Sequence, residues 1–145
     1  MDNAPPHSED EVKQPTPAPT RVAMHGRIIE VSDPWWTHIR DGTKTVEGRK
    51  GSPEWKSIAA GDTMKIRRTL LEPEEPDTTP QEMFTVRVVR VTHYETISEY
   101  LSAETLARTL PGVATVEAGV AVYSQWWEPA MVNMYGVLAI ELEVR

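Results

Sequence analysis

The sequence contains no cysteine among its 145 residues. It can therefore form no disulfide framework, no thiolate zinc site and no cysteine nucleophile. No apolar run approaches the roughly 20 residues that a helix needs to cross a bilayer. The first residues, MDNAPPHSEDEVKQ, lack the basic and apolar segments of a secretory signal. We therefore expect an intracellular, cytoplasmic protein, with the nucleus as the alternative location, and no membrane partner.

Histidine, the other common metal ligand, is also sparse. The four histidines are scattered along the chain, and no two of them stand four residues apart as they would on one helix face. Without cysteine partners they predict no metal site. The sequence also has no glycine-rich phosphate loop and no nucleophile elbow around a serine. We therefore expect no cofactor.

Charge is distributed unevenly along the chain. The formal net charge is −7, which argues against unspecific binding of polyanions. The stretch from Arg40 to Arg68 differs, because its eight lysines and arginines outnumber its four acidic residues. This segment predicts a local attraction for phosphate. The alternative is that strands simply carry Lys and Arg on their solvated face.

Proline marks the parts of the chain that we do not expect to fold. Residues 1–23 combine proline with acidic and small side chains and include the run PTPAPT. Such a segment cannot bury enough apolar area to offset the entropy of ordering it. We therefore predict a disordered tail over 1–23 and one folded domain over 24–145. Residues 71–81 predict an acidic loop that is interrupted by prolines.

Hydrophobic spacing and turn residues predict a mixture of strands and helices within the domain. Alternating or β-branched stretches predict strands over 24–31, 41–50, 63–70, 82–91 and 135–144. Capping residues and prolines predict helices over 32–42, 52–58, 96–110 and 115–127. Several strands would be antiparallel, with the helices inserted between them. This order indicates an α+β domain around a small curled sheet or barrel.

The most specific pattern lies in the stretch DGTKTVEGRK. It contains Gly42, Lys44, Glu47 and Arg49 at the spacing G-x-K-x-x-E-x-R, which is similar to the signature of ASCH (activating signal cointegrator homology) domains. Three further pieces resemble the same family: GD at 61–62, LPGV at 110–113 and YGVLAIEL at 135–142. From residue 26 onward, the chain therefore resembles an ASCH domain, a relative of the PUA RNA-binding fold.

The resemblance implies a PUA-like mixed β-barrel with inserted helices and a cleft whose floor carries the motif. It also implies that the partner is RNA, a nucleoside or a nucleotide. The residues expected to contact this ligand are Lys44, Glu47, Arg49, Lys65, Arg67, Arg68 and Trp36. The cations would hold phosphate, and an exposed tryptophan would stack on a base. The alternative for the tryptophan pairs is packing of the barrel against its helices.

A second interpretation is a small hydrolase. Some ASCH relatives remove the acetyl group of N4-acetylcytidine with a lysine, a threonine three residues later and a distal glutamate, and at least one relative is described as a ribonuclease. Here Lys44 occupies the lysine position, Glu47 stands where those enzymes have threonine, and Glu117 is the candidate distal acid. A third interpretation is an interaction module whose tail over 1–23 or acidic loop over 72–77 recruits a protein partner. We expect a monomer in each case.

Strand geometry leaves one question open. In a regular strand Glu47 and Arg49 share a face, while Lys44 points to the opposite face. The three charges converge only if the strand begins after Lys44 or bulges near it. The alternative is a structural Glu47–Arg49 ion pair with Lys44 in solvent.

Overall fold

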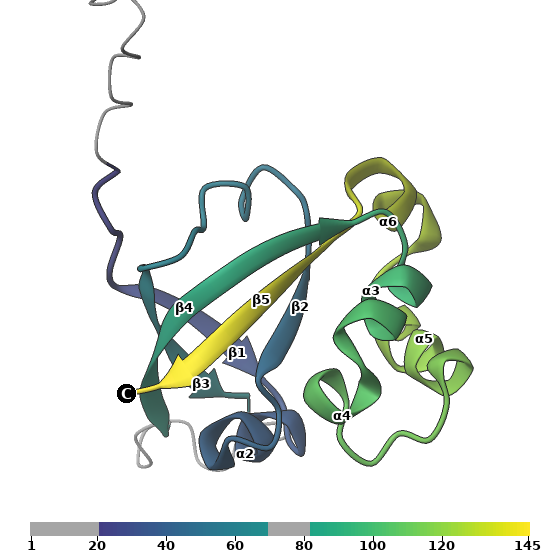
Figure 1. The fold of residues 1–145 in the computed structure, drawn as a ribbon, viewed down its shortest axis with the longest axis horizontal. Coiled ribbons are helices and arrows are strands. Elements are labelled where there is room, and N and C mark those ends of the chain that lie inside the picture. Colours follow the sequence, from purple (N-terminus) through teal and green to yellow (C-terminus); the bar gives the residue numbers. More distant parts are fainter. Residues whose placement is uncertain (1–20, 70–81) are drawn as a thin grey trace, which may run out of the picture.

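The centre of the fold is a mixed sheet of five strands, seen in a computed structural model that describes residues 21–69 and 82–145 (Figure 1). The strands are β1 (Arg27–Val31), β2 (Val46–Lys50), β3 (Thr63–Arg68), β4 (Met83–Tyr94) and β5 (Val137–Val144). Their spatial order is β1-β3-β4-β5-β2. β1 runs parallel to β3, and the other neighbouring pairs are antiparallel. The sheet curls into a half-barrel, with β1 and β2 as its two end strands.

Alternation along the strands fills the inside of the half-barrel with apolar side chains. The main cluster comprises Ile29, Val31, Met64, Ile66, Val86, Val88, Leu138, Ile140 and Leu142. Helix α2 (Trp35–Asp41) packs against this cluster through Trp36 and Ile39. Gly42 ends α2 with a left-handed backbone (φ 81°), which glycine adopts without strain and which turns the chain toward β2.

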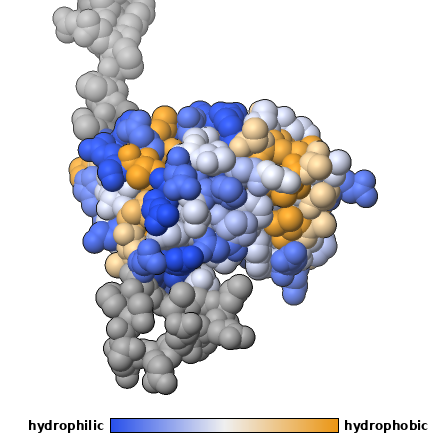
Figure 2. Space-filling view, turned by 90° about the horizontal axis from the view of Figure 1, so that it is seen from below, coloured by the Kyte–Doolittle hydropathy of each residue, from blue (hydrophilic) through white to orange (hydrophobic). Residues whose placement is uncertain are grey.

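The remaining helices lie together beside the sheet (Figure 1). They are α3 (Ile97–Glu104), α4 (Leu106–Thr109), α5 (Val116–Ser124) and α6 (Pro129–Tyr135). A second apolar cluster joins them to the sheet and includes Val46, Val137, Ala139, Tyr100, Leu101, Leu110 and Tyr123. Figure 2 shows apolar surface gathered over this helical part, while hydrophilic surface covers more of the sheet side. In α5, Glu117 is the only charged residue.

A buried carboxylate anchors the junction between α3 and α4. Glu104 is 2% exposed, and its side chain accepts hydrogen bonds from Arg90 (2.7 and 2.9 Å), Tyr94 (2.6 Å) and Arg108 (3.2 Å). The next residue, Thr105, has φ 75°, a left-handed conformation that is unusual for a β-branched residue. The Glu104 network thus holds the chain where it breaks one helix and starts the next.

The structure confirms the α+β class and the small mixed barrel with inserted helices. It also corrects individual elements. The helix expected over 96–110 is divided at Thr105, and the one expected over 52–58 is a series of turns. Helix α6 was not expected. Residues 1–20 of the expected tail lie outside the described residues, and so does the whole of the expected acidic loop over 71–81. Within the described ranges, none of the helices has the length and apolar character of a membrane span.

Candidate functional site

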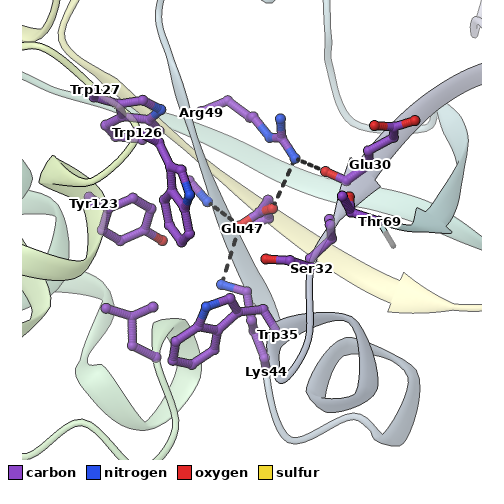
Figure 3. Close-up of a pocket in the computed structure, with 13 residues that line it drawn as sticks. Glu30, Ser32, Trp35, Lys44, Glu47, Arg49, Thr69, Tyr123, Trp126 and Trp127 are labelled. Carbon is purple, nitrogen blue, oxygen red and sulfur yellow. Dashed lines mark hydrogen bonds and ion pairs between the residues drawn. The ribbon is translucent and has the colours of Figure 1, made fainter. Parts of the chain in front are cut away.

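A pocket of about 280 Å³ opens between the end strands β1 and β2 and the helices beside them (Figure 3). Its lining combines a floor of charged residues with a wall of aromatic ones. The lining residues are Glu30, Val31, Ser32, Trp35, Lys44, Glu47, Gly48, Arg49, Thr69, Leu110, Tyr123, Trp126 and Trp127. The volume is close to the lower limit for small-molecule sites, which begin at about 300 Å³.

Lys44 reaches the floor because β2 begins two residues after it, at Val46. The main-chain N–H of Lys44 donates to the carbonyl of His38 in α2 (2.9 Å), so this residue belongs to the connection before the strand. Strand alternation therefore does not apply to it. Lys44 and Glu47 come within 3.3 Å, and Arg49 lies 3.2 Å from the other oxygen of Glu47. The structure brings the three motif charges together.

The ammonium group of Lys44 has a partner for each of its three N–H bonds. Nζ lies 2.7 Å from the carbonyl oxygen of Val46, 2.5 Å from that of Thr109 and 3.3 Å from Oε1 of Glu47. Burial lowers the pKa of Lys44, and the neighbouring Glu47 carboxylate opposes this effect. A neutral amine would have to point its lone pair at one of three acceptors. The geometry therefore favours a charged Lys44 that is 1% exposed.

Glu47 is held as a carboxylate by donors on both oxygens. Oε1 accepts from the main-chain N–H of Gly48 (3.0 Å) and Oε2 accepts from Nη2 of Arg49 (3.2 Å). Burial by itself would raise the pKa of Glu47. The charges of Lys44 and Arg49, together with the Gly48 N–H, outweigh burial and hold the pKa below its ordinary value. Glu47 therefore accepts hydrogen bonds and donates none.

Arg49 connects the two ends of the sheet. Its Nη2 also donates to the main-chain oxygen of Glu30 in β1 (3.0 Å). The guanidinium carbon lies 5.2 Å from the ring centre of Trp55, a distance typical of a cation–π contact. Arg27 approaches the same ring at 4.7 Å. Nε of Arg49 is buried and has no hydrogen-bond partner among the described residues.

Aromatic rings form the wall opposite Arg49 and Glu30. Tyr123 lies 4.8 Å from the ring of Trp127 and meets Trp126 edge-on at 6.2 Å. Trp126 is 51% exposed, while Trp35 contributes a half-buried ring from the start of α2 (Figure 3). The hydroxyl groups of Tyr123 and Tyr100 lie 2.9 Å apart. Burial, followed by the charge of Glu47, raises the pKa of the Tyr123 hydroxyl, so it stays protonated.

Gly48 is the one position of the floor that requires the absence of a side chain. A Cβ at this position would lie 2.8 Å from the hydroxyl oxygen of Tyr100 and 2.9 Å from two of its ring carbons. The ring of Tyr100 can thus pack directly against β2. This close approach joins the helical cluster to the strand that carries Glu47 and Arg49.

The structure does not bring the other expected site residues to the pocket. Trp36 is 2% exposed and donates Nε1 to the carbonyl of Ile66 in the core (3.2 Å), so Trp35 lines the pocket in its place. Glu117 is exposed on α5 and is not among the lining residues. The ion pair between Glu47 and Arg49 exists, but Lys44 is buried beside it and does not lie in solvent.

The cations expected on β3 also lie outside the pocket. Arg67 pairs with the Glu30 side chain at 2.6 Å. Arg68 pairs with Asp33 and with Glu82. Lys65 is exposed to solvent. Four aromatic lining residues were not expected at the site: Trp35, Tyr123, Trp126 and Trp127. For the three tryptophans, the available signal was the two adjacent pairs in the sequence, Trp35–Trp36 and Trp126–Trp127.

Among the described residues no set of three or more His, Asp or Glu side chains is placed to hold a metal ion. The lining residues of the pocket can offer hydrogen bonds, electrostatic attraction and aromatic stacking.

Comparison with known proteins places the chain in a family. A model of the ASCH domain matches residues 29–145, and the chain belongs to the ASCH domain family. The crystal structure of the hypothetical protein PH0355 is similar, with 28% identity and a TM-score of 0.69 over 84% of this chain and 100% of that one. The solution NMR structure of protein PF0455 from Pyrococcus furiosus is similar as well, with 27% identity and a TM-score of 0.63 over 82% and 96%. No curated protein matches significantly. The fold is thus the PUA-like α+β fold of ASCH domains.

Proposed function

We propose that this protein binds RNA or a nucleoside-like ligand, and that a single base occupies the pocket between β1 and β2. The observation that carries the proposal is the meeting of an aromatic wall with a floor of buried, paired charges. Planar heterocycles stack on aromatic rings and present donors and acceptors at their edges. A volume of about 280 Å³ suits one base with its sugar and is too small for a stretch of chain.

The basic segment contributes less than its composition suggests. Arg40, Lys44, Arg49, Arg67 and Arg68 each lie within 4.0 Å of a carboxylate. Within the described residues, the cations of this segment without such a partner are Lys50, Lys56 and Lys65. Cations that are already paired attract phosphate weakly, because their fields are partly cancelled. The affinity should therefore come mainly from the pocket.

Titration of the four common ribonucleosides and of a short single-stranded RNA tests the proposal. Trp126→Ala should weaken binding about 5- to 150-fold, because stacking of one base contributes about 1–3 kcal/mol. Met134→Ala is the matched control, since Met134 is 69% exposed on α6 and does not line the pocket. Its affinity should equal that of the wild type. Absence of binding to all five probes at millimolar concentration, or an unchanged Trp126→Ala variant, would contradict the proposal.

Hydrolysis of an acylated nucleoside or of RNA is the second candidate. The floor offers one ionised carboxylate, Glu47, that could take a proton from water. Lys44 lacks a free lone pair in this arrangement, and Glu117 is not at the pocket, so binding is better supported than turnover. Incubation with N4-acetylcytidine and with a short RNA decides between them. A hydrolase would release cytidine from N4-acetylcytidine or shorter fragments from RNA. This activity should be lost in Glu47→Gln and kept in Glu95→Gln.

A further inference from the structure

Glu47 has capacity for one more hydrogen bond than it makes within the protein. A carboxylate offers about two acceptor positions on each oxygen. Oε1 uses both of its positions, for the Gly48 N–H at 3.0 Å and the Lys44 ammonium at 3.3 Å. Oε2 uses one position, for Nη2 of Arg49 at 3.2 Å. The remaining position on Oε2 belongs to a residue that lines the pocket (Figure 3).

The neighbours of Glu47 prevent it from changing role or position. Three donors converge on the carboxylate, so it remains ionised and acts only as an acceptor. Its side chain is 10% exposed and is anchored to the connection before β2, to β2 itself and, through Arg49, to β1. Lys44 cannot supply a donor to a ligand, because its three N–H bonds already have partners.

We propose that Glu47 makes the pocket selective for a heteroaromatic ring that directs an N–H donor at its floor. The class of ligand is an amino-substituted or ring-N–H base, and this inference rests on the proposed function. An alkyl group directed at Oε2 would leave this buried oxygen without its hydrogen bond. An acceptor directed at Oε2 would in addition be repelled by the carboxylate charge. Sites built around such a bond discriminate strongly against analogues that lack the donor.

Three adenosine derivatives isolate the donor from the bulk of the ring. Adenosine has two N–H bonds on its exocyclic nitrogen, N6-ethyladenosine keeps one, and N6,N6-dimethyladenosine has none. The last two contain the same atoms, so they differ in the donor at equal size. Cytidine, N4-ethylcytidine and N4,N4-dimethylcytidine form the equivalent pyrimidine series. For uridine, methylation of ring nitrogen N3 removes the donor. For guanosine, methylation of N1 must be combined with dimethylation of the exocyclic N2, because that amino group is a second donor.

The expected result, for the nucleoside that binds most tightly, is that the ethyl derivative binds at least tenfold more tightly than the dimethyl isomer. Glu47→Gln should reduce this ratio below threefold, because an amide can present either a donor or an acceptor. Glu95→Gln, on an exposed residue away from the pocket, should keep it. If uridine or guanosine binds most tightly, the unmodified nucleoside should bind at least tenfold more tightly than the N-methylated form that lacks the donors.

The outcomes separate this inference from the proposed function. Equal affinity for the two isomers overturns the selectivity of Glu47 and leaves nucleoside binding intact. A ratio that persists in a folded Glu47→Gln variant assigns the effect to shape and also overturns it. If that variant does not fold, the comparison of isomers on the wild type still decides. No binding of any nucleoside or RNA contradicts both proposals.

Discussion

Nη2 of Arg49 in β2 donates a hydrogen bond of 3.0 Å to the main-chain oxygen of Glu30 in β1. These strands are the two ends of the order β1-β3-β4-β5-β2 and do not pair with each other. The Arg49 side chain therefore links the two edges of the sheet. The same nitrogen donates to Glu47 at 3.2 Å. One guanidinium group therefore sets both the separation of the end strands and the position of the pocket floor.

Trp55 should control ligand binding through Arg49, whose guanidinium lies over its ring. We expect Trp55→Leu to weaken nucleoside binding about tenfold while Trp55→Phe stays within about threefold, since Phe keeps a ring face. Adding Trp55→Leu to Arg49→Ala should cause no further loss, which isothermal titration of the four proteins would measure. Independent, additive losses would show that Trp55 acts by another route.

Arg27 provides the matched control for that cycle. It approaches the same Trp55 ring at 4.7 Å but donates to the carbonyl of Glu54 and does not line the pocket. Arg27→Ala should leave nucleoside affinity unchanged, whatever it does to stability. A loss as large as that of Arg49→Ala would mean that the Trp55 region matters for packing alone.

Removing the buried cation should destabilise the fold. Lys44→Met leaves Glu47 with one charged partner and deprives the carbonyls of Val46 and Thr109 of a donor. We expect a loss of about 3–5 kcal/mol in the free energy of unfolding, measured in urea. Combining Lys44→Met with Glu47→Leu should recover part of it, because no uncompensated charge remains. Lys56→Met, at an exposed position, should change stability by less than about 0.5 kcal/mol.

RNA binding should depend only weakly on salt. Single strands give a slope of about −0.7 in log K against log salt for each phosphate neutralised. Three lysines of the basic segment without an acidic partner in the described structure would give a slope no steeper than about −2. Fluorescence anisotropy of a labelled oligonucleotide, recorded between about 50 and about 300 mM KCl, would measure this slope. A slope beyond about −4 would indicate a phosphate-binding surface outside the pocket.

Acid should weaken the anchor between α3 and α4. The hydrogen bonds from Arg90, opposed by burial and reinforced by Tyr94, hold the pKa of Glu104 below its ordinary value of 4.5. The unfolded chain therefore takes up this proton at a higher pH than the folded chain does. The stabilisation by Glu104 is complete above pH 4.5 and is lost as the pH falls through the lower folded pKa.

The Glu104→Gln variant tests this dependence. Its urea unfolding should show a deficit of at least about 2 kcal/mol at pH 7, because a buried charged network is broken. That deficit should shrink as the pH falls below 4.5, where the wild type loses its own contribution. A deficit that stays constant over this range would show that Glu104 is not ionised in the folded protein.

Local patterns predicted most of the elements for identifiable reasons. Thr96 and Thr115 accept main-chain hydrogen bonds from Glu99 and Ala118, as expected of cap residues. Gly42 ends the first helix, and the apolar run at the end of the chain forms β5. The division at Thr105 was not predictable, because the network that holds it comes from β4, through Arg90 and Tyr94. Helix α6 was not predicted either, because it has one buried residue, Val132, and no periodic stripe of apolar residues.

The sequence by itself determined the family motif, the five strands and most of the helices. It did not determine that Trp35 lines the pocket while Trp36 packs in the core, that Trp126 and Trp127 both line the pocket, or that Lys44 is enclosed. Those outcomes depend on how far α4 lies from β2 and on where β2 begins, and such separations are set by contacts between residues distant in the chain. Thr109 is the clearest example: its carbonyl oxygen, 65 residues from Lys44 in sequence, lies 2.5 Å from the ammonium group.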